Sequence, residues 1–443
     1  MTVGRPSKQF TPRWPVNVQL ASQLSAAKTA DLRSALIPDL DAEDALKAAQ
    51  DMAGEIARDQ QLVDAVFQFE QGDADRALGA VGSLLEAHPD WVEGHVVMAQ
   101  LLSQTGSIAA FEQFLTDTIR DAGDDIALVT SCVRQLSEAG RHAKVDAIIP
   151  QLRAQHGDHL FFSLIEAITA SETDDLERAD RQFQRAASQG GLLSLPHVRH
   201  LIRKGDATQA ATLAEAFVNR YPRHQGAWGL LATAWRLTGD SRHDWLVHRP
   251  GLVRTIDLDI SADAISALAT RLRALHVARY HPFDQSLRGG TQTAGRIFRH
   301  DDPEIRQIRE LFRRAVRAHI DALPPMDAAH PLLGRDRSRF RFSDSWSVRL
   351  VDGGFHVSHF HPQGTISSAF YVTYPQDPRQ TGHSGWLTIG EPPECLRTGL
   401  GPLQMIEPKA GRLVLFPSFM WHGTRPFPRG ERMTIAFDTV LGD

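Results

Sequence analysis

Residues 355–362 read FHVSHFHP, and residues 411–424 read GRLVLFPSFMWHGT. Both runs are rich in aromatic and β-branched residues and lie next to glycine or proline, a composition typical of short strands. Side chains on a strand alternate between its two faces, so His359 and His361 would face the same way. His422 on the later strand can supply a third imidazole. The two stretches therefore predict a β fold built around a metal site.

Short strands are predicted on both sides of this pair of stretches, separated by proline and glycine turns. They cover residues 342–350, 356–361, 367–374, 386–389, 412–416 and 432–438. Upstream, the pattern predicts helices over residues 262–276 and 303–321, with a polar glycine loop at residues 286–293 between them. Several short strands of this kind favour a β-sandwich or barrel.

A carboxylate-binding pair follows the last histidine. Arg432 and Thr434 are two residues apart on a predicted strand, so they share a face. The planar guanidinium matches a carboxylate, and the threonine adds a hydroxyl donor. The alternative is an arginine at the rim that pairs with Glu431 or Asp438. A buried arginine on this strand would instead require an anionic partner, which predicts an acidic co-substrate beside the metal.

The identity of the metal ligands is less constrained by spacing. The chain has 20 histidines, so a pair such as His359 and His361 can also arise as two surface residues flanking Phe360. His356 could replace one of the other ligands, or it could lie behind them or contact the substrate. Imidazole ligands suit iron, zinc and copper. Which of these histidines and His422 bind the metal stays open at this point.

The N-terminal half contains a repeat. Turn residues recur every 34 positions at Gly72, Gly106 and Gly140, and Asp174 takes the next step. Gly205 comes slightly early, and Gly239 is again 34 residues later. A second series of breaks lies half a period away, with apolar residues at helical spacing between the breaks. Two helices in a period of 34 are typical of tetratricopeptide repeats, which stack because one helix pair cannot bury its apolar face alone.

Length and composition bound the rest. A chain of 443 residues predicts two or three domains, which we place at residues 1–41 (a partly helical extension), 42–245 (the repeats) and 246–443 (the β domain with flanking helices). The formal net charge of -5 gives no reason to expect nucleic acid as a partner. Two distant cysteines, no apolar signal-peptide core and no membrane-length apolar run predict a soluble, cytoplasmic protein.

The C-terminal motifs together resemble the iron(II)/2-oxoglutarate oxygenases of the double-stranded β-helix fold, a jelly-roll or cupin-like architecture. The resemblance rests on residues 359–362, 367–372, 411–418, 421–424 and 431–432 and covers roughly residues 280–440. It implies an oxidoreductase, more narrowly a dioxygenase, that uses Fe(II), 2-oxoglutarate and O2. The expected fold class is thus α+β and multidomain, with an all-α solenoid followed by the double-stranded β-helix.

The resemblance also assigns roles to residues. It implies that iron is held by His359 and His422, and we add His361 as a third catalytic metal ligand, although the superfamily usually has a carboxylate at that position. It implies that Arg432 and Thr434 hold the far carboxylate of 2-oxoglutarate, and we add Tyr371 to this cofactor-binding group. The candidates to contact substrate are Trp346, His356, Trp386, Arg288 and Gln292.

Tetratricopeptide repeats joined to an oxygenase domain resemble peptidyl hydroxylases, so we expect a hydroxylase acting on a peptide or protein that the repeats recruit. Two alternatives remain. The repeats could scaffold a partner while the β domain is catalytically inactive, in which case His422→Ala would leave the biological activity intact. The three histidines could also serve a metal dioxygenase that does not use 2-oxoglutarate, in which case Arg432 would be dispensable.

Overall fold

The computed structural model describes residues 42–105, 107–190, 194–278, 285–293, 296–375 and 382–442, with the backbone alone for residues 42–52. The predicted N-terminal extension, residues 1–41, lies outside the described residues. The chain divides into two compact units, Met1–Leu101 and Leu102–Asp443. The domain boundary that we predict after residue 245 stays a prediction.

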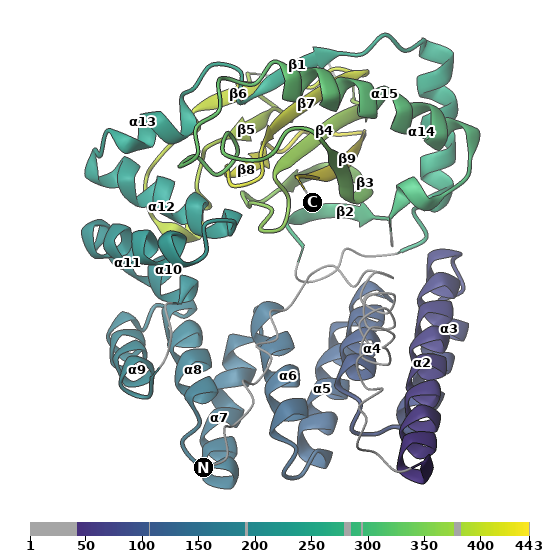
Figure 1. Cartoon of the computed structure of the whole chain (residues 1–443), viewed down its shortest axis with the longest axis vertical. Coiled ribbons are helices and arrows are strands. Elements are labelled where there is room, and N and C mark those ends of the chain that lie inside the picture. Colours follow the sequence, from purple (N-terminus) through teal and green to yellow (C-terminus); the bar gives the residue numbers. More distant parts are fainter. Residues whose placement is uncertain are drawn as a thin grey trace. The chain divides into compact units, whose positions relative to one another are not determined.

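Consecutive antiparallel helices make up the first half of the described chain (Figure 1). The early ones are α2 (Ala42–Glu70), α3 (Ala74–Ala87) and α4 (Val92–Thr105). The second unit continues with α5 (Ile108–Asp121), α6 (Ile126–Glu138), α7 (His142–His156), α8 (Leu160–Glu172), α9 (Leu176–Ser188), α10 (Leu195–Lys204), α11 (Ala207–Arg220), α12 (Gln225–Thr238) and α13 (Arg242–Val247). This run of helices agrees with the predicted all-α half, and its tetratricopeptide identity stays a prediction.

The 34-residue series marks the turn inside each helix pair. Every described member has a positive φ, namely Gly72, Gly140, Asp174, Gly205 and Gly239, whereas Gly106 lies outside the described residues. A left-handed residue ends a helix and frees the chain to reverse, and glycine adopts that conformation at little steric cost. In three of these pairs the next residue is an aspartate whose side chain caps the second helix: Asp73, Asp175 and Asp206. The sequence period therefore corresponds to a repeated stop-and-start signal.

Two antiparallel sheets form the C-terminal part. The larger has the order β1-β7-β4-β9-β3-β2, and the smaller has the order β6-β5-β8. The strands are β1 (Arg254–Asp257), β2 (Leu287–Gln292), β3 (Phe340–His356), β4 (Ile366–Thr373), β5 (Leu387–Ile389), β6 (Gln404–Ile406), β7 (Arg412–Pro417), β8 (His422–Thr424) and β9 (Glu431–Leu441). This arrangement is jelly-roll-like, which confirms the predicted fold class.

The two faces of the larger sheet have different neighbours. Alternate residues of β9 (Met433, Ile435 and Phe437) join a core with α14 (Ala262–Leu275) and α15 (Pro303–Asp321). The intervening residues face the other way, and they include Arg432, Thr434 and Asp438. A second core connects that inner face, through Tyr371, Val414 and Phe416, with the smaller sheet and with α10 to α13. Trp245, where we predict the end of the repeat domain, therefore packs against a core that the helices share with the smaller sheet.

Two local predictions are wrong. Residues 356–361 do not form a regular strand, because β3 ends at His356 and the chain continues in an extended conformation with one isolated bridge at His359. Residues 286–293 are mostly strand rather than loop, since β2 pairs with β3. The glycines there permit this pairing, because a Cβ at Gly290 would lie 2.2 Å from the carbonyl oxygen of Arg349.

Among the described residues, we find no helix that combines the length and apolar character needed to cross a lipid bilayer.

Candidate functional site

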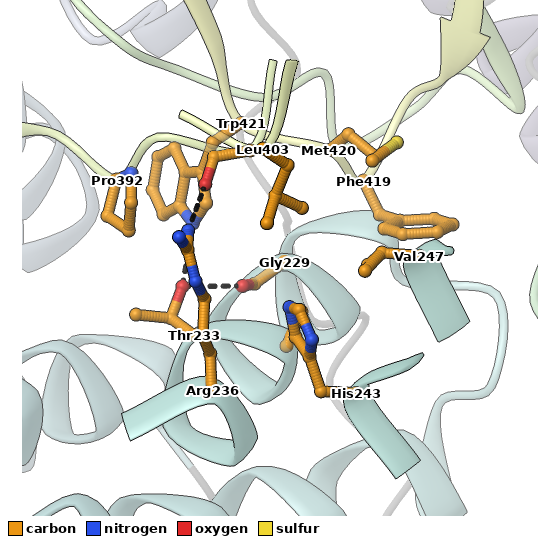
Figure 2. A pocket seen from close by; sticks show the side chains of 12 residues that line it. Gly229, Thr233, Arg236, His243, Val247, Pro392, Leu403, Phe419, Met420 and Trp421 are labelled. Carbon is orange, nitrogen blue, oxygen red and sulfur yellow. Dashed lines mark hydrogen bonds between the residues drawn. The ribbon is translucent and has the colours of Figure 1, made fainter. Parts of the chain in front are cut away.

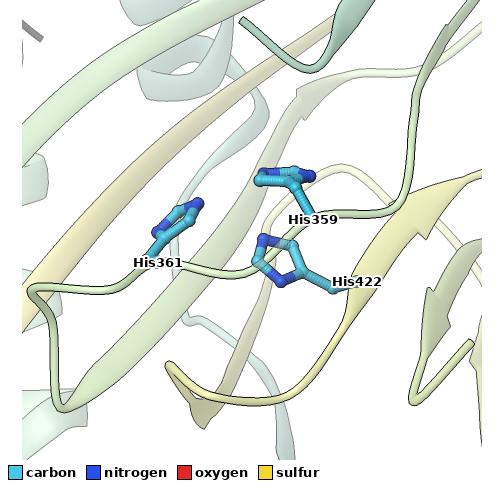
Figure 3. A group of neighbouring side chains, drawn as sticks. All are labelled: His359, His361 and His422. Atoms are coloured by element: carbon cyan, nitrogen blue, oxygen red, sulfur yellow. The ribbon is translucent and has the colours of Figure 1, made fainter. Parts of the chain in front are cut away.

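Three histidine side chains converge on the inner side of the jelly roll. The candidate ligand atoms of His359, His361 and His422 all lie within 4.8 Å of one another. Figure 3 shows the three rings gathered around one space, with His359 and His361 on one segment and His422 at the start of β8. This is the predicted trio, and its donor set is suited to a divalent metal ion.

Backbone hydrogen bonds hold the two segments in register. The amide of His359 donates to the carbonyl of His422 (2.9 Å), and the amide of His422 donates to the carbonyl of His359 (2.8 Å). The amide of His361 donates to the carbonyl of Ser418 (3.0 Å). Because His359 and His422 form a directly bonded antiparallel pair, their side chains emerge on the same face and their ring centres lie 4.2 Å apart.

The second nitrogen of each ring is already used. Nδ1 of His359 lies 2.9 Å from the carbonyl oxygen of Val357, and Nδ1 of His422 lies 3.1 Å from that of Met420. A carbonyl oxygen only accepts, so each Nδ1 must carry the proton and each Nε2 keeps its lone pair free for a ligand. The hydroxyl of Ser286 lies 3.3 Å from Nε2 of His359. The tautomer that a metal requires is therefore set before any metal binds.

His361 has a carboxylate behind it instead of a carbonyl. Nδ1 of His361 lies 2.7 Å from Oδ1 of Asp438, which also accepts from the hydroxyl of Ser367 (2.6 Å). Asp438 is 7% exposed. A carboxylate in this position orients the imidazole and makes its other nitrogen a stronger donor. The structure thus places a carboxyl group directly behind the third imidazole.

Burial keeps His356, His359 and His422 neutral. It lowers the pKa of His359 to about 3, with the neighbouring His361 adding to the effect, and it lowers the pKa of His422 well below the ordinary value. The pKa of His356 is also lowered well below that value, first by burial and then by His359. A neutral imidazole is the form that binds a metal ion, so these rings do not need to lose a proton at neutral pH.

Arg432 and Thr434, the pair predicted to bind a carboxylate, lie on the inner face of β9. Arg432 has no counterion among the described residues. Arg432 is 2% exposed, and its Nε and Nη1 lack hydrogen-bond partners in the described structure, as does the buried hydroxyl of Tyr371. The guanidinium carbon lies 5.1 Å from the centre of the Tyr371 ring. Thr434, 7% exposed, is paired in register with Tyr371 on β4. Burial lowers the pKa of Arg432, yet a guanidinium stays charged in proteins.

The rim alternative for Arg432 is therefore wrong. Glu431, which points to the opposite face, pairs with Arg273 (2.7 Å) and Arg349 (2.6 Å). Asp438 pairs with His361. A buried guanidinium with unused donors is costly, and an anion that fits beside Tyr371 and Thr434 would remove that cost.

The substrate-contact candidates divide into two groups. Trp346 lies beside His361, with ring centres 5.3 Å apart, and His356 lies beside His359, with its Nδ1 3.0 Å from the hydroxyl of Ser286. For the other three the structure describes contacts away from the histidine rings, although Gln292 lies opposite Val348, which pairs with Thr434, and so shares the inner face. Arg288 donates to the carbonyls of Gln285 and Leu287, Gln292 is buried on β2, and the ring of Trp386 lies against His383.

Asp438 is the functional residue that the sequence analysis did not identify as part of the site. It lies four residues after Thr434 and therefore on the same face of β9. That alternation could have indicated its direction. Its partner, His361, is 77 residues away, and no local pattern reports that contact.

A second cluster of potential ligands lies on α13, where His243, Asp244 and His248 come together. Nδ1 of His248 is 2.8 Å from Oδ1 of Asp244, and Nδ1 of His243 is 3.4 Å from the same oxygen. Asp244 and His248 are exposed. These contacts already satisfy the groups as a surface hydrogen-bond cluster. In the inner trio, by contrast, each Nδ1 is bonded to a carbonyl or carboxylate oxygen, which leaves the Nε2 atoms as the candidate ligand atoms.

Comparisons with known proteins single out the same region. Residues 344–438 match a family model described as "Putative 2OG-Fe(II) oxygenase". No curated protein matches the chain. The matched segment includes the three histidines, Arg432 and Asp438.

Solved structures give distant likenesses. A prolyl-4-hydroxylase from Pseudomonas putida is 19% identical, covering 43% of this chain and 94% of its own, with a TM-score of 0.30. HygX from Streptomyces hygroscopicus, solved with nickel, 2-oxoglutarate and hygromycin B, is 11% identical over 43% of this chain and 83% of its own (TM-score 0.30). AviO1 from Streptomyces viridochromogenes Tue57 is 15% identical over 42% and 89% (TM-score 0.29). At these scores the solved structures carry no argument, and the family model matches residues 344–438 alone.

Proposed function

We propose that this chain is a hydroxylase that uses Fe(II), 2-oxoglutarate and O2, and the match of residues 344–438 to the model of 2OG-Fe(II) oxygenases supports this proposal. Its metal would be held by Nε2 of His359, His361 and His422. Bound iron would supply the redox chemistry that couples conversion of 2-oxoglutarate and O2 to succinate and CO2 with insertion of one oxygen atom into a substrate C–H bond. The remaining steps below concern what the side chains of this chain do.

The observation that carries the proposal is the buried guanidinium of Arg432. Its unpartnered Nε and Nη1 and the unpartnered hydroxyl of Tyr371 form a set of donors on the inner face that also holds the histidines. The far carboxylate of 2-oxoglutarate fits these donors as a planar, doubly hydrogen-bonded anion. Such a clamp orients the keto acid toward the histidines and contributes affinity that neither a three-histidine dioxygenase nor an inactive scaffold would need.

His361 completes the metal site in this proposal. Three neutral imidazoles leave the charge of the metal uncompensated, and the buried carboxylate of Asp438 behind His361 compensates part of it. Ser367 holds that carboxylate in place through a hydrogen bond of 2.6 Å. The pair Asp438 and His361 thus does the work that a directly bound carboxylate does in other sites of this class.

The substrate that we propose is a peptide or protein segment. Support comes from the helix pairs that precede the β domain, because stacked repeats offer extended surfaces for chains. Trp346, which lies beside His361, is the side chain best placed to contact the oxidised residue.

The test is an anaerobic titration of the purified full-length protein with Fe(II) and 2-oxoglutarate, followed by admission of air. We expect saturable 2-oxoglutarate binding that depends on metal, succinate formation with candidate peptides, and a peptide mass gain of one oxygen atom. Metal binding without any binding of 2-oxoglutarate would favour the three-histidine dioxygenase. Absence of both would favour the inactive scaffold.

A further inference from the structure

All three histidine-bearing positions lie next to residues that pack on one helix of the repeat region, α12. Phe360 lies between His359 and His361, and Trp421 directly precedes His422. The rings of Phe360 and Trp421 contact each other, with centres 4.5 Å apart, and both belong to the core that α12 shares with the smaller sheet. Both rings lie against α12, because the Phe360 ring is next to Gly226 and Gly229 and the indole of Trp421 is bonded to Thr233.

Two glycines of α12 allow this approach. A Cβ at Gly226 would lie 2.6 Å from the Phe360 ring, and a Cβ at Gly229 would lie 2.6 Å from the carbonyl oxygen of Phe419 and 3.2 Å from the Phe360 ring. Atoms do not pack at 2.6 Å, so any larger residue would displace the segments that carry the histidines. Glycine is unfavourable inside a helix, and here the close approach accounts for its presence.

Polar contacts continue the same interface. Nε1 of Trp421 donates to the hydroxyl of Thr233 (2.8 Å), which donates to the carbonyl of Gly229 (2.9 Å). Arg236 donates to the carbonyls of Gly390 (3.0 Å) and Gly401 (2.8 Å). Figure 2 shows Thr233 and Arg236 of α12 pointing toward the β domain, with the indole of Trp421 beside them and bonded to Thr233. The hydrogen bond between Trp421 and Thr233 is buried.

We infer that α12 is the support that sets the spacing of the three imidazoles, with Phe360 and Trp421 as positioning residues. This inference rests on the proposed function, in that it takes the histidines as metal ligands. Functional side chains must be held within about 0.5 Å of the productive geometry. In this protein a helix of the repeat region, α12, would hold the histidine-bearing segments in place. The helical repeats would therefore be part of the metal site's construction as well as a separate recognition surface.

Cobalt(II) binding to the full-length protein tests this, because the visible absorption of cobalt reports both affinity and coordination geometry. We expect Gly229→Ala to weaken cobalt binding at least tenfold and to change the absorption spectrum. The matched control is Gly79→Ala in α3, where a Cβ would meet nothing within 4 Å. That variant is expected to bind cobalt as the unaltered protein does.

A second set of variants serves if Gly229→Ala does not fold. Thr233→Val keeps the shape of the side chain but leaves the buried indole N–H of Trp421 without its acceptor, and we expect about fivefold weaker cobalt binding. The conservative variant Thr233→Ser keeps a hydroxyl that can accept from the indole N–H of Trp421. It should therefore keep most of the affinity that Thr233→Val loses.

The outcomes separate the two proposals. If the folded Gly229→Ala and Thr233→Val variants bind cobalt with unchanged affinity and spectrum, the support role of α12 is wrong, while the proposed function stands. If the unaltered protein binds no cobalt, both fall. Circular dichroism and thermal unfolding of each variant establish which of them are folded.

Discussion

The two ends of β9 present opposite solutions to burying a charge. Asp438 at one end is fully engaged, since it accepts hydrogen bonds from His361 and Ser367. Arg432 at the other end is equally buried, yet its Nε and Nη1 lack partners among the described residues. Both side chains lie on the same face of one strand.

This difference distinguishes a group that builds a site from a group that binds a ligand. A buried charge is tolerated when its partners are part of the fold, and Asp438 meets that condition. A buried guanidinium without a partner cannot become neutral, so it indicates an anion that arrives separately. The comparison predicts that changes at the two ends should affect different ligands.

The largest expected effect is at Arg432. Replacing it in Arg432→Met should weaken 2-oxoglutarate binding by two orders of magnitude or more, about 3 kcal/mol, because the carboxylate loses a buried charged partner. Metal affinity should stay within about twofold, as the histidines are untouched. Calorimetric titration of the metal-loaded protein measures both. The matched control is Arg349→Met on β3, whose arginine faces outward to Glu431 and should not affect 2-oxoglutarate. Equal binding by wild type and Arg432→Met would contradict the carboxylate clamp.

At the opposite end, Asp438→Asn should lower metal affinity by about 10- to 100-fold, because the carboxylate that orients and polarises His361 is lost. Binding of 2-oxoglutarate at saturating metal should change much less. Competition with a metal-sensitive dye gives the affinity. Asp257→Asn on β1 is the control, since that carboxylate pairs with Arg412 and Lys409 away from the histidines. A variant that lost 2-oxoglutarate but kept metal would reverse the roles of the two ends.

His319 of α15 resembles Arg432 in one respect: it is buried, and both of its ring nitrogens lack partners among the described residues. Burial lowers its pKa from 6.5 to about 4, so it stays neutral and needs no ligand. Below pH 6.5 the unfolded chain binds the extra proton, so stability is lost as the pH falls. At about pH 5.5 the loss amounts to about 1.4 kcal/mol.

The variant His319→Leu should therefore unfold with a smaller acid dependence while binding metal and 2-oxoglutarate normally. Urea unfolding at neutral pH and at about pH 5.5 measures the difference between the two free energies of unfolding. An acid dependence equal to that of the wild type would show that His319 is protonated in the folded protein. Loss of 2-oxoglutarate binding would instead show that the core between α15 and the outer face of the larger sheet also affects the ligand.

The smallest expected effect is at Tyr371. Tyr371→Phe keeps the ring beside Arg432 and removes only the unpartnered hydroxyl, so 2-oxoglutarate affinity should fall about fivefold, equivalent to about 1 kcal/mol for one hydrogen bond. The same titration as for Arg432→Met measures it. An unchanged affinity would remove Tyr371 from the clamp and leave the carboxylate to Arg432 and Thr434.

Much of this organisation follows from local patterns. The residues at the breaks of the helical repeat, such as Gly140 and Asp174, have positive φ. A residue in this left-handed conformation ends a helix wherever it occurs in the chain. Strand alternation likewise places Arg432 and Thr434 on one face whatever the partners of β9 are. These features depend only on the backbone conformation of a few neighbouring residues.

What only the tertiary structure decided is which distant groups meet. His361 receives its carboxylate from Asp438, 77 residues later, and Trp421 finds Thr233 188 residues away. The register of β9 and the packing of α12 determine these contacts, and neither is encoded by spacing along the chain. The histidine motif could therefore be found in the sequence, whereas the charge behind it and the helix beneath it depend on how the folded elements pack.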